Sequence, residues 1–130
     1  MTDVTQFEPT GPGPDEAIDT RHAVQTFLSN TVRDNPVVLF MKGEPEQPRC
    51  GFSALTVQIL DHLGVPFVGV DVLQNDDLRQ GIKVFSDWPT IPQLYVNGEF
   101  VGGCDIVKEM FQAGELKTYF TERGLIEAQG

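Results

Sequence analysis

Residues 37–53 read VVLFMKGEPEQPRCGFS, and this stretch decides the fold. Five consecutive apolar residues, Val37–Met41, predict a buried strand. A loop that contains Pro45 and Pro48 follows, and after Cys50 the apolar residues recur at helical spacing. We therefore expect a helix to begin directly after Cys50, which places this cysteine at the N-terminus of a helix.

The position of Cys50 favours a reactive thiol. The free N–H groups and the positive end of the helix dipole stabilise a thiolate, and Lys42 and Arg49 add positive charge nearby. The alternative is a small hydrophobic residue packed in a core, but Cys50 lies between Arg49 and Gly51, away from the apolar face of the helix. The fourth position of the motif is Ser53, whose hydroxyl cannot resolve a mixed disulfide. We predict a site with one thiol, whose second sulfur comes from elsewhere.

Composition and charge limit the class of protein. The chain has 130 residues, 40% of them hydrophobic, which suits one domain with a single core. No apolar run approaches the roughly 20 residues of a membrane span. Two cysteines and no pattern of a signal or transit peptide predict a reducing compartment, the cytoplasm. A net charge of −10 argues against nonspecific nucleic-acid binding.

The chain divides into two parts of different composition. Residues 1–15 are rich in proline and glycine, contain acidic residues and have no basic residue. We predict a disordered acidic tail there, and we leave a role in partner binding open. Residues 16–130 are predicted to form the folded domain.

Turn residues and apolar periodicity predict the remaining elements. Asn75 and Asp105 are expected to cap helices, and Asn97-Gly98 is expected to close a hairpin. The predicted order of elements is α-β-α-β-α-β-β-α-α, an α/β fold with a four-stranded mixed sheet flanked by helices. The elements are helices over residues 15–33, 50–64, from 75 on, 105–111 and 115–123, and strands over residues 37–41, 67–72, 93–96 and 99–101.

Four motifs carry a resemblance to a known family. They are Met41-Lys42-Gly43, Cys50-Gly51-Phe52-Ser53, Trp88-Pro89-Thr90-Ile91-Pro92-Gln93 and Gly102-Gly103-Cys104-Asp105. In this order and spacing they make the chain resemble a monothiol glutaredoxin of the Cys-Gly-Phe-Ser class, from about residue 21 to 123. The resemblance implies the thioredoxin fold.

The resemblance also implies a glutathione site. Lys42 and Arg79 would bind the glycine carboxylate through charge-assisted hydrogen bonds. Ile91 would pair with the cysteinyl backbone as a strand does, and its bond to Pro92 is expected to be cis. Each residue taken alone has a structural interpretation: solvated charges for the two cations, and the start of a strand in trans for Pro92. Their occurrence together and in this order favours the site.

The second glycine motif would complete the glutathione site. The helix N-terminus at Cys104 and Asp105 would bind the γ-glutamyl carboxylate, and the Asp105 side chain would bind the ammonium group. Two interpretations of Cys104 are equally supported: a small buried residue, or a thiol that forms a disulfide under oxidation. Trp88 is expected to pack the loop, and His22 and His62 are expected to be surface residues.

Two functions of different classes remain. The first is carriage of a [2Fe–2S] cluster, which typically needs four thiolates; two chains, each giving Cys50 and one bound glutathione, supply four. The resemblance implies a cluster-bridged homodimer, an apo monomer, and as partners BolA-type proteins and apo iron–sulfur acceptor proteins. The alternative is a glutathione-dependent thiol-disulfide oxidoreductase that deglutathionylates proteins. The whole signature favours the carrier, with weak oxidoreductase activity at most.

Overall fold

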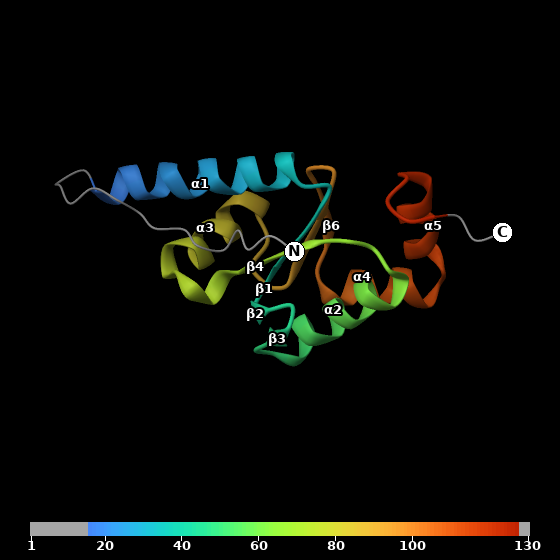
Figure 1. Ribbon diagram of the computed structural model, residues 1–130. Helices are drawn as coiled ribbons and strands as arrows, with labels where there is room; N and C mark the ends of the chain where they lie inside the picture. The colour runs from blue at the N-terminus through green and yellow to red at the C-terminus, as the bar shows by residue number, and fades with distance from the viewer. Residues whose placement is uncertain (1–15, 128–130) are drawn as a thin grey trace.

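The computed structural model describes residues 16–127, which form a four-stranded mixed sheet with helices on both faces (Figure 1). Strand β1 (Val37–Met41) is a central strand, parallel to β4 (Val68–Asp71) and antiparallel to β5 (Gln93–Val96). Strand β6 (Glu99–Gly102) pairs with β5 and completes the order β4-β1-β5-β6. This topology confirms the predicted thioredoxin-like α/β fold.

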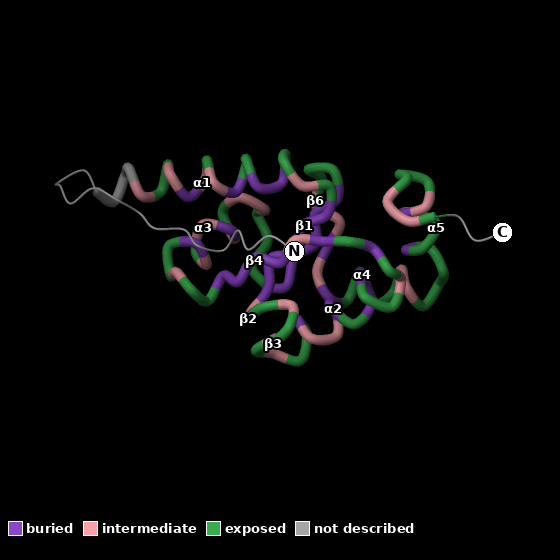
Figure 2. Tube along the Cα trace, viewed as in Figure 1, coloured by how far each residue is buried: buried purple, intermediate pink, exposed green. Residues whose placement is uncertain are grey.

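The helices divide between the two faces of the sheet. Alternate residues of β1 point to opposite faces, so the strand contributes to two separate apolar clusters. Val38 and Phe40 pack with residues of α1 (Glu16–Asp34) and α3 (Asp76–Ser86). Leu39 and Met41 pack with residues of α2 (Gly51–Leu63), α4 (Cys104–Gln112) and α5 (Glu115–Glu122). Figure 2 shows the central strands buried and α1 buried along one side. A 3-10 turn, η1 (Val72–Gln74), precedes α3.

Several local expectations are confirmed. The Asn75 side chain caps α3 by accepting the N–H of Leu78 at 3.2 Å. Asn97 and Gly98 both have positive φ, 51° and 83°, as a tight hairpin turn between two twisted strands requires. The bond between Ile91 and Pro92 is cis.

Two expectations were wrong in detail. The cap of α4 is Gly103, and no side chain bonds to the helix N-terminus there; Asp105 lies in the first turn instead. The stretch after Met41 was expected to be a loop, yet it contains a small hairpin of β2 (Gly43–Glu44) and β3 (Gln47–Pro48). Strands of two residues are too short to show periodicity, and the buried Asp71 side chain helps to fix this hairpin by accepting the Gly43 N–H at 3.0 Å.

Two further expectations concern the ends of the chain and the membrane. The tail predicted over residues 1–15 lies outside the described residues. Within the described part, no helix is both long and apolar enough to cross a membrane.

Candidate functional site

Cys50 is the N-cap of α2. Its backbone is extended, with φ of −150° and ψ of 155°, and its sulfur accepts the backbone N–H of Ser53 at 3.4 Å. A helix leaves its first N–H groups without backbone partners, so an N-cap side chain is placed to accept from them. Here that acceptor is a sulfur atom, and the half-buried side chain keeps part of its surface open to solvent.

Ser53 contributes a second contact to the same sulfur. Its hydroxyl oxygen lies 3.4 Å from Cys50 Sγ and accepts the backbone N–H of Lys42 at 3.0 Å. A protonated thiol donates to this hydroxyl oxygen, whereas a thiolate accepts from the hydroxyl hydrogen. Ser53 is fully buried, so the contact is shielded from water. The sequence reasoning treated Ser53 only as a missing thiol, although its place three residues after the cap indicated this contact.

These contacts determine the pKa of Cys50. Partial burial is the largest single influence and acts to raise the pKa of the thiol. Hydrogen bonds from Ser53 and Phe52 and the positive charge of Lys42 act in the opposite direction. Together they outweigh burial, so the pKa of Cys50 lies below that of an ordinary cysteine. The site therefore favours a thiolate, which is the nucleophilic and metal-binding form.

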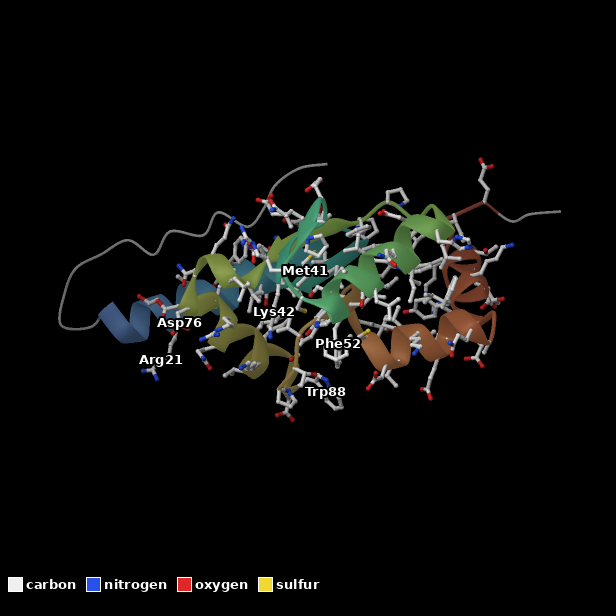
Figure 3. The ribbon with its side chains drawn as sticks, turned by 90° about the horizontal axis from the view of Figure 1, so that it is seen from below. Arg21, Met41, Lys42, Phe52, Asp76 and Trp88 are labelled. Carbon is white, nitrogen blue, oxygen red and sulfur yellow. The ribbon has the colours of Figure 1, made fainter. Side chains whose placement is uncertain are left out.

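A cavity of about 430 Å³ lies next to this thiol. It is bounded by the end of β1, the start of α2, one face of α3, the loop over residues 88–92 and the start of α4. Figure 3 shows Lys42, Phe52 and Trp88 in this part of the molecule. All six residues predicted to bind glutathione line the cavity: Lys42, Arg79, Ile91, Pro92, Cys104 and Asp105. Cys50 itself is not among the lining residues, but Phe52, two residues later, and Lys42, whose charge acts on the thiol, both line the cavity.

The cavity is positive within an acidic chain. Three of the chain's nine lysine and arginine residues line it, and Asp105 is the single acidic residue on its wall. Lys83 is the cation that sequence reasoning did not assign to the site. It lies one helical turn after Arg79, and that spacing on α3 is a signal that could have found it. A cavity with this charge favours an anionic ligand.

Two features of the wall affect how an anion would bind. Arg79 forms an ion pair with Asp76 at 2.7 Å, so its guanidinium group already has a carboxylate partner. At the start of α4, the cap residue Gly103 offers no side chain to the first N–H groups. Free N–H groups at a helix N-terminus bind anions, and Cys104 and Asp105 line the cavity at that point.

Apolar side chains also line the cavity. Phe52, Trp88 and Ile106 are 64%, 46% and 41% exposed, which is unusual for residues of their size. The Trp88 ring packs on Phe100, with centroids 6.1 Å apart, so the expected packing role is confirmed. Trp88 also lines the cavity, however, which the sequence reasoning did not expect.

The remaining candidates lie outside the cavity or lack partners for chemistry. His22 and His62 are exposed on helix surfaces, as expected, and His62 contacts Phe111 edge to face. Both cysteines are free thiols, and Cys104 is buried. Among the described residues, no group of three or more His, Cys, Asp or Glu side chains could hold a metal ion. The described part of one chain therefore has no complete metal site of its own.

Comparison with known proteins identifies the family. The family model "Glutaredoxin" matches residues 37–101. A probable monothiol glutaredoxin 2 of Rickettsia typhi is 59% identical over 91 residues, which are 70% of this chain and 82% of the relative. The chain belongs to the monothiol glutaredoxin family. Glutaredoxin 4 of Pasteurella multocida is 50% identical over 95 residues, or 73% of this glutaredoxin and 87% of the relative.

Solved structures agree with this assignment. Reduced apo GrxS14 of poplar has a TM-score of 0.70 and 50% identity, and the match covers 79% of this glutaredoxin and 94% of the poplar chain. A buckwheat glutaredoxin in complex with glutathione has a TM-score of 0.72 at 24% identity, covering 88% of this chain and 99% of that chain. At that identity the buckwheat structure supports the fold alone. Together with the geometry of Cys50, the comparisons establish a single-thiol glutaredoxin.

Proposed function

We propose that the cavity beside Cys50 binds glutathione. The observation that carries this proposal is the combination of a stabilised thiol and a cationic cavity, which matches a ligand with a sulfur atom and two carboxylates. The glycine carboxylate would bind Lys42 and Arg79, with Lys83 one helical turn further along α3. The γ-glutamyl carboxylate would bind the free N–H groups at the start of α4, and its ammonium group would bind Asp105.

The middle of glutathione would lie along the loop between α3 and β5. Ile91 and Pro92 line the cavity there, and an extended peptide can pair with the backbone of such a segment. In this orientation the cysteinyl sulfur of glutathione would face the side on which Cys50 lies. The ligand would supply the second sulfur that Ser53 cannot.

We further propose that the bound cargo of this protein is a [2Fe–2S] cluster. Such a cluster usually has four thiolate ligands. The donor chemistry of Cys50 fits, because its lowered pKa favours the thiolate, but the described part of one chain has only two cysteines, and the thiol of Cys104 is buried. Two chains and two glutathione molecules would complete the set. The cluster would then bridge a symmetric homodimer that returns to monomers when it leaves.

This ligand set suits a carrier. Two of the four ligands would be small molecules that exchange with solvent, so an acceptor protein with its own cysteines could take the cluster. Apo iron–sulfur proteins are the proposed acceptors, and BolA-type proteins are proposed as further partners. We propose the cytoplasm as the location, because a reducing compartment would keep Cys50 free.

A second candidate function uses the same thiol without a cluster. The Cys50 thiolate would attack the glutathione sulfur of a glutathionylated protein, and the protein thiolate would leave. The thiolate of a second glutathione would then attack the Cys50 mixed disulfide, giving glutathione disulfide and restoring Cys50. The lowered pKa of Cys50 favours this route as much as it favours cluster binding.

Anaerobic reconstitution separates the two candidates. Purified protein is incubated with iron, sulfide and glutathione, and visible absorption, iron content and molecular mass are measured. The proposal expects one [2Fe–2S] cluster and two glutathiones per two chains, no cluster when glutathione is omitted, and monomers after the cluster is removed. Absence of a cluster together with rapid turnover of a glutathione mixed disulfide would make the oxidoreductase the better assignment.

A further inference from the structure

The loop between α3 and β5 forms one wall of the cavity, yet it has no regular secondary structure. Residues 88–92 all line the cavity, and residues 87–90 are exposed. A loop of this kind needs contacts from a rigid element if the wall is to keep one shape. Its hydrogen bonds to α3 hold only its start: the Trp88 N–H donates to the Lys83 carbonyl at 3.2 Å and lies 3.1 Å from Ser86 Oγ, and the Trp88 carbonyl lies 3.4 Å from the same Ser86 hydroxyl.

Gln93 connects the rest of this loop to the sheet. It is the first residue of β5, pairs with Phe40 of the central strand and is fully buried. Its side-chain amide Nε2 donates to the carbonyl oxygen of Trp88 at 3.2 Å and to that of Thr90 at 3.1 Å. One buried amide therefore binds two carbonyls of the cavity wall from the rigid side of the fold.

The side-chain oxygen of Gln93, Oε1, indicates that this residue does more than fill space. Its Oε1 is buried, and none of the described residues donates a hydrogen bond to it. A buried acceptor without a partner destabilises a fold, and an apolar side chain of the same size would avoid the penalty. A position that served packing alone would therefore suit leucine or methionine better than glutamine. The two hydrogen bonds that Nε2 donates to the loop carbonyls compensate for the unpaired oxygen.

Trp88 depends on this arrangement. Its ring packs on Phe100, and its indole nitrogen lies on the side of Gly103, 3.9 Å from the point that a Cβ on Gly103 would occupy. Gly103 is the cap of α4 and also lines the cavity. A shift of the Trp88 backbone would thus move an aromatic side chain relative to the proposed anion site.

We infer that Gln93 is a positioning residue that holds the 88–92 loop in the shape that the cavity needs for its ligand. This inference rests on the proposed function insofar as the ligand is glutathione. Gln93 is buried behind the loop and is not among the residues that line the cavity, so it would act through Trp88 and Thr90. Its loss would leave the fold in place and release the loop.

The test replaces Gln93 by methionine, which keeps the volume and removes both donors. Trp88 is the only tryptophan of the chain, so its fluorescence reports on this loop alone. In Gln93→Met we expect acrylamide quenching of Trp88 to increase about twofold and the affinity for reduced glutathione, measured by calorimetry, to fall about tenfold, as the loss of two ordinary hydrogen bonds predicts. The thermal midpoint should change little, because the loss of these two hydrogen bonds and the removal of the unpaired oxygen act in opposite directions.

The matched control is Gln25→Met. Gln25 is a glutamine of intermediate burial, and its Nε2 donates to the Gly81 carbonyl at 3.0 Å between α1 and α3. This variant should change neither the quenching of Trp88 nor the affinity for glutathione. A wild-type protein that does not bind glutathione would contradict the proposed function, while the quenching would still decide the role of Gln93.

Two results would overturn the inference itself. The first is a folded Gln93→Met protein in which both the quenching and the affinity match those of the wild type. The second is failure of both Gln93→Met and Gln93→Leu to fold, because Gln93 would then serve the whole fold and not the loop.

Discussion

Two helices of this protein begin at a cysteine, and the two ends differ in chemistry. Cys50 is the cap of α2, and its sulfur accepts a backbone N–H from the first turn. Cys104 is the first residue of α4, one position further along, behind a glycine cap. There the thiol is buried at 9% exposure, and the N–H groups of the first turn have no side-chain acceptor.

The difference shows that position relative to the helix cap decides what a cysteine at a helix N-terminus does. A side chain at the cap can reach the free N–H groups, so at α2 these groups stabilise a thiolate. A side chain one residue later points away from them, so at α4 they remain open to a ligand. One helix end supplies the reactive sulfur of the site and the other supplies a place for a carboxylate.

The largest expected effect is the contrast between Cys50→Ser and Cys104→Ser. Loss of Cys50 should abolish both cluster assembly and formation of a glutathione mixed disulfide, because Cys104, the other thiol of the described part, is buried. Loss of Cys104 should leave most of the cluster assembly and most of the mixed-disulfide formation. Absorption spectroscopy after reconstitution and mass spectrometry after treatment with glutathione disulfide measure the two outcomes. Equal cluster content in Cys50→Ser and wild type would contradict the contrast.

Lys42→Ala tests whether the two helix ends share one electrostatic environment. Removing this cation should raise the pKa of Cys50 and weaken glutathione binding by about tenfold, the size of one charge-assisted hydrogen bond. Lys108→Ala removes an exposed lysine of α4 that does not line the cavity. This control variant should change neither the pKa of Cys50 nor the affinity for glutathione. If Lys42→Ala weakened glutathione binding and left the pH profile of Cys50 alkylation unchanged, the Lys42 charge would act on the ligand alone.

Ser53→Ala addresses the α2 end by itself. The variant loses the hydroxyl near the sulfur, so the pKa of Cys50 should rise and alkylation at neutral pH should slow severalfold. It also leaves the Lys42 N–H without its acceptor, which should lower the free energy of unfolding by about 1–3 kcal/mol. Thr56→Val removes another buried hydroxyl from α2, one that bonds to the Phe52 carbonyl, and is the control for stability without contact to the sulfur. Unchanged alkylation in Ser53→Ala would show that the hydroxyl does not stabilise the thiolate.

Asp76→Asn should give the smallest effect. The Asp76 carboxylate pairs with Arg79 at a surface position, 74% exposed, where such pairs contribute little. Neutralising it should free Arg79 and strengthen glutathione binding by about twofold at low salt, with the gain lost at high salt. Asp77→Asn removes the same charge from the same turn of α3 and should strengthen glutathione binding less than Asp76→Asn does. Equal effects of the two variants would mean that only the long-range field matters.

Much of the fold could be predicted from the sequence. Apolar runs, the Asn75 cap and the Asn97-Gly98 turn are local signals, and the structure confirms the elements that they predicted. The β2–β3 hairpin was missed because it depends on the distant Asp71 carboxylate, which no local pattern reveals.

The site was harder to predict than the fold. The motifs pointed to the six cavity residues, but a motif does not show that Lys83 reaches the same cavity or that Ser53 bonds to the sulfur. The cap of α4 was placed at Asp105 because aspartate is a common cap, whereas the close turn after β6 puts Gly103 there. The two hydrogen bonds from the Gln93 side-chain amide to the carbonyls of Trp88 and Thr90 could not be predicted, because only the folded chain shows that these groups meet.

The central claim is that Cys50 is a stabilised thiolate and the reactive thiol of the site. The rate of alkylation by iodoacetamide, measured against pH in Cys104→Ser and in Cys50→Ser, tests it directly. A lowered pKa gives more thiolate at a given pH, so the Cys104→Ser protein should react rapidly at neutral pH and reach its plateau at a lower pH than a free cysteine in a peptide. The Cys50→Ser protein should react slowly across the range, because its remaining thiol is buried. The account would be contradicted by equal rates in the two proteins, or by a Cys50 profile that coincides with that of the free peptide.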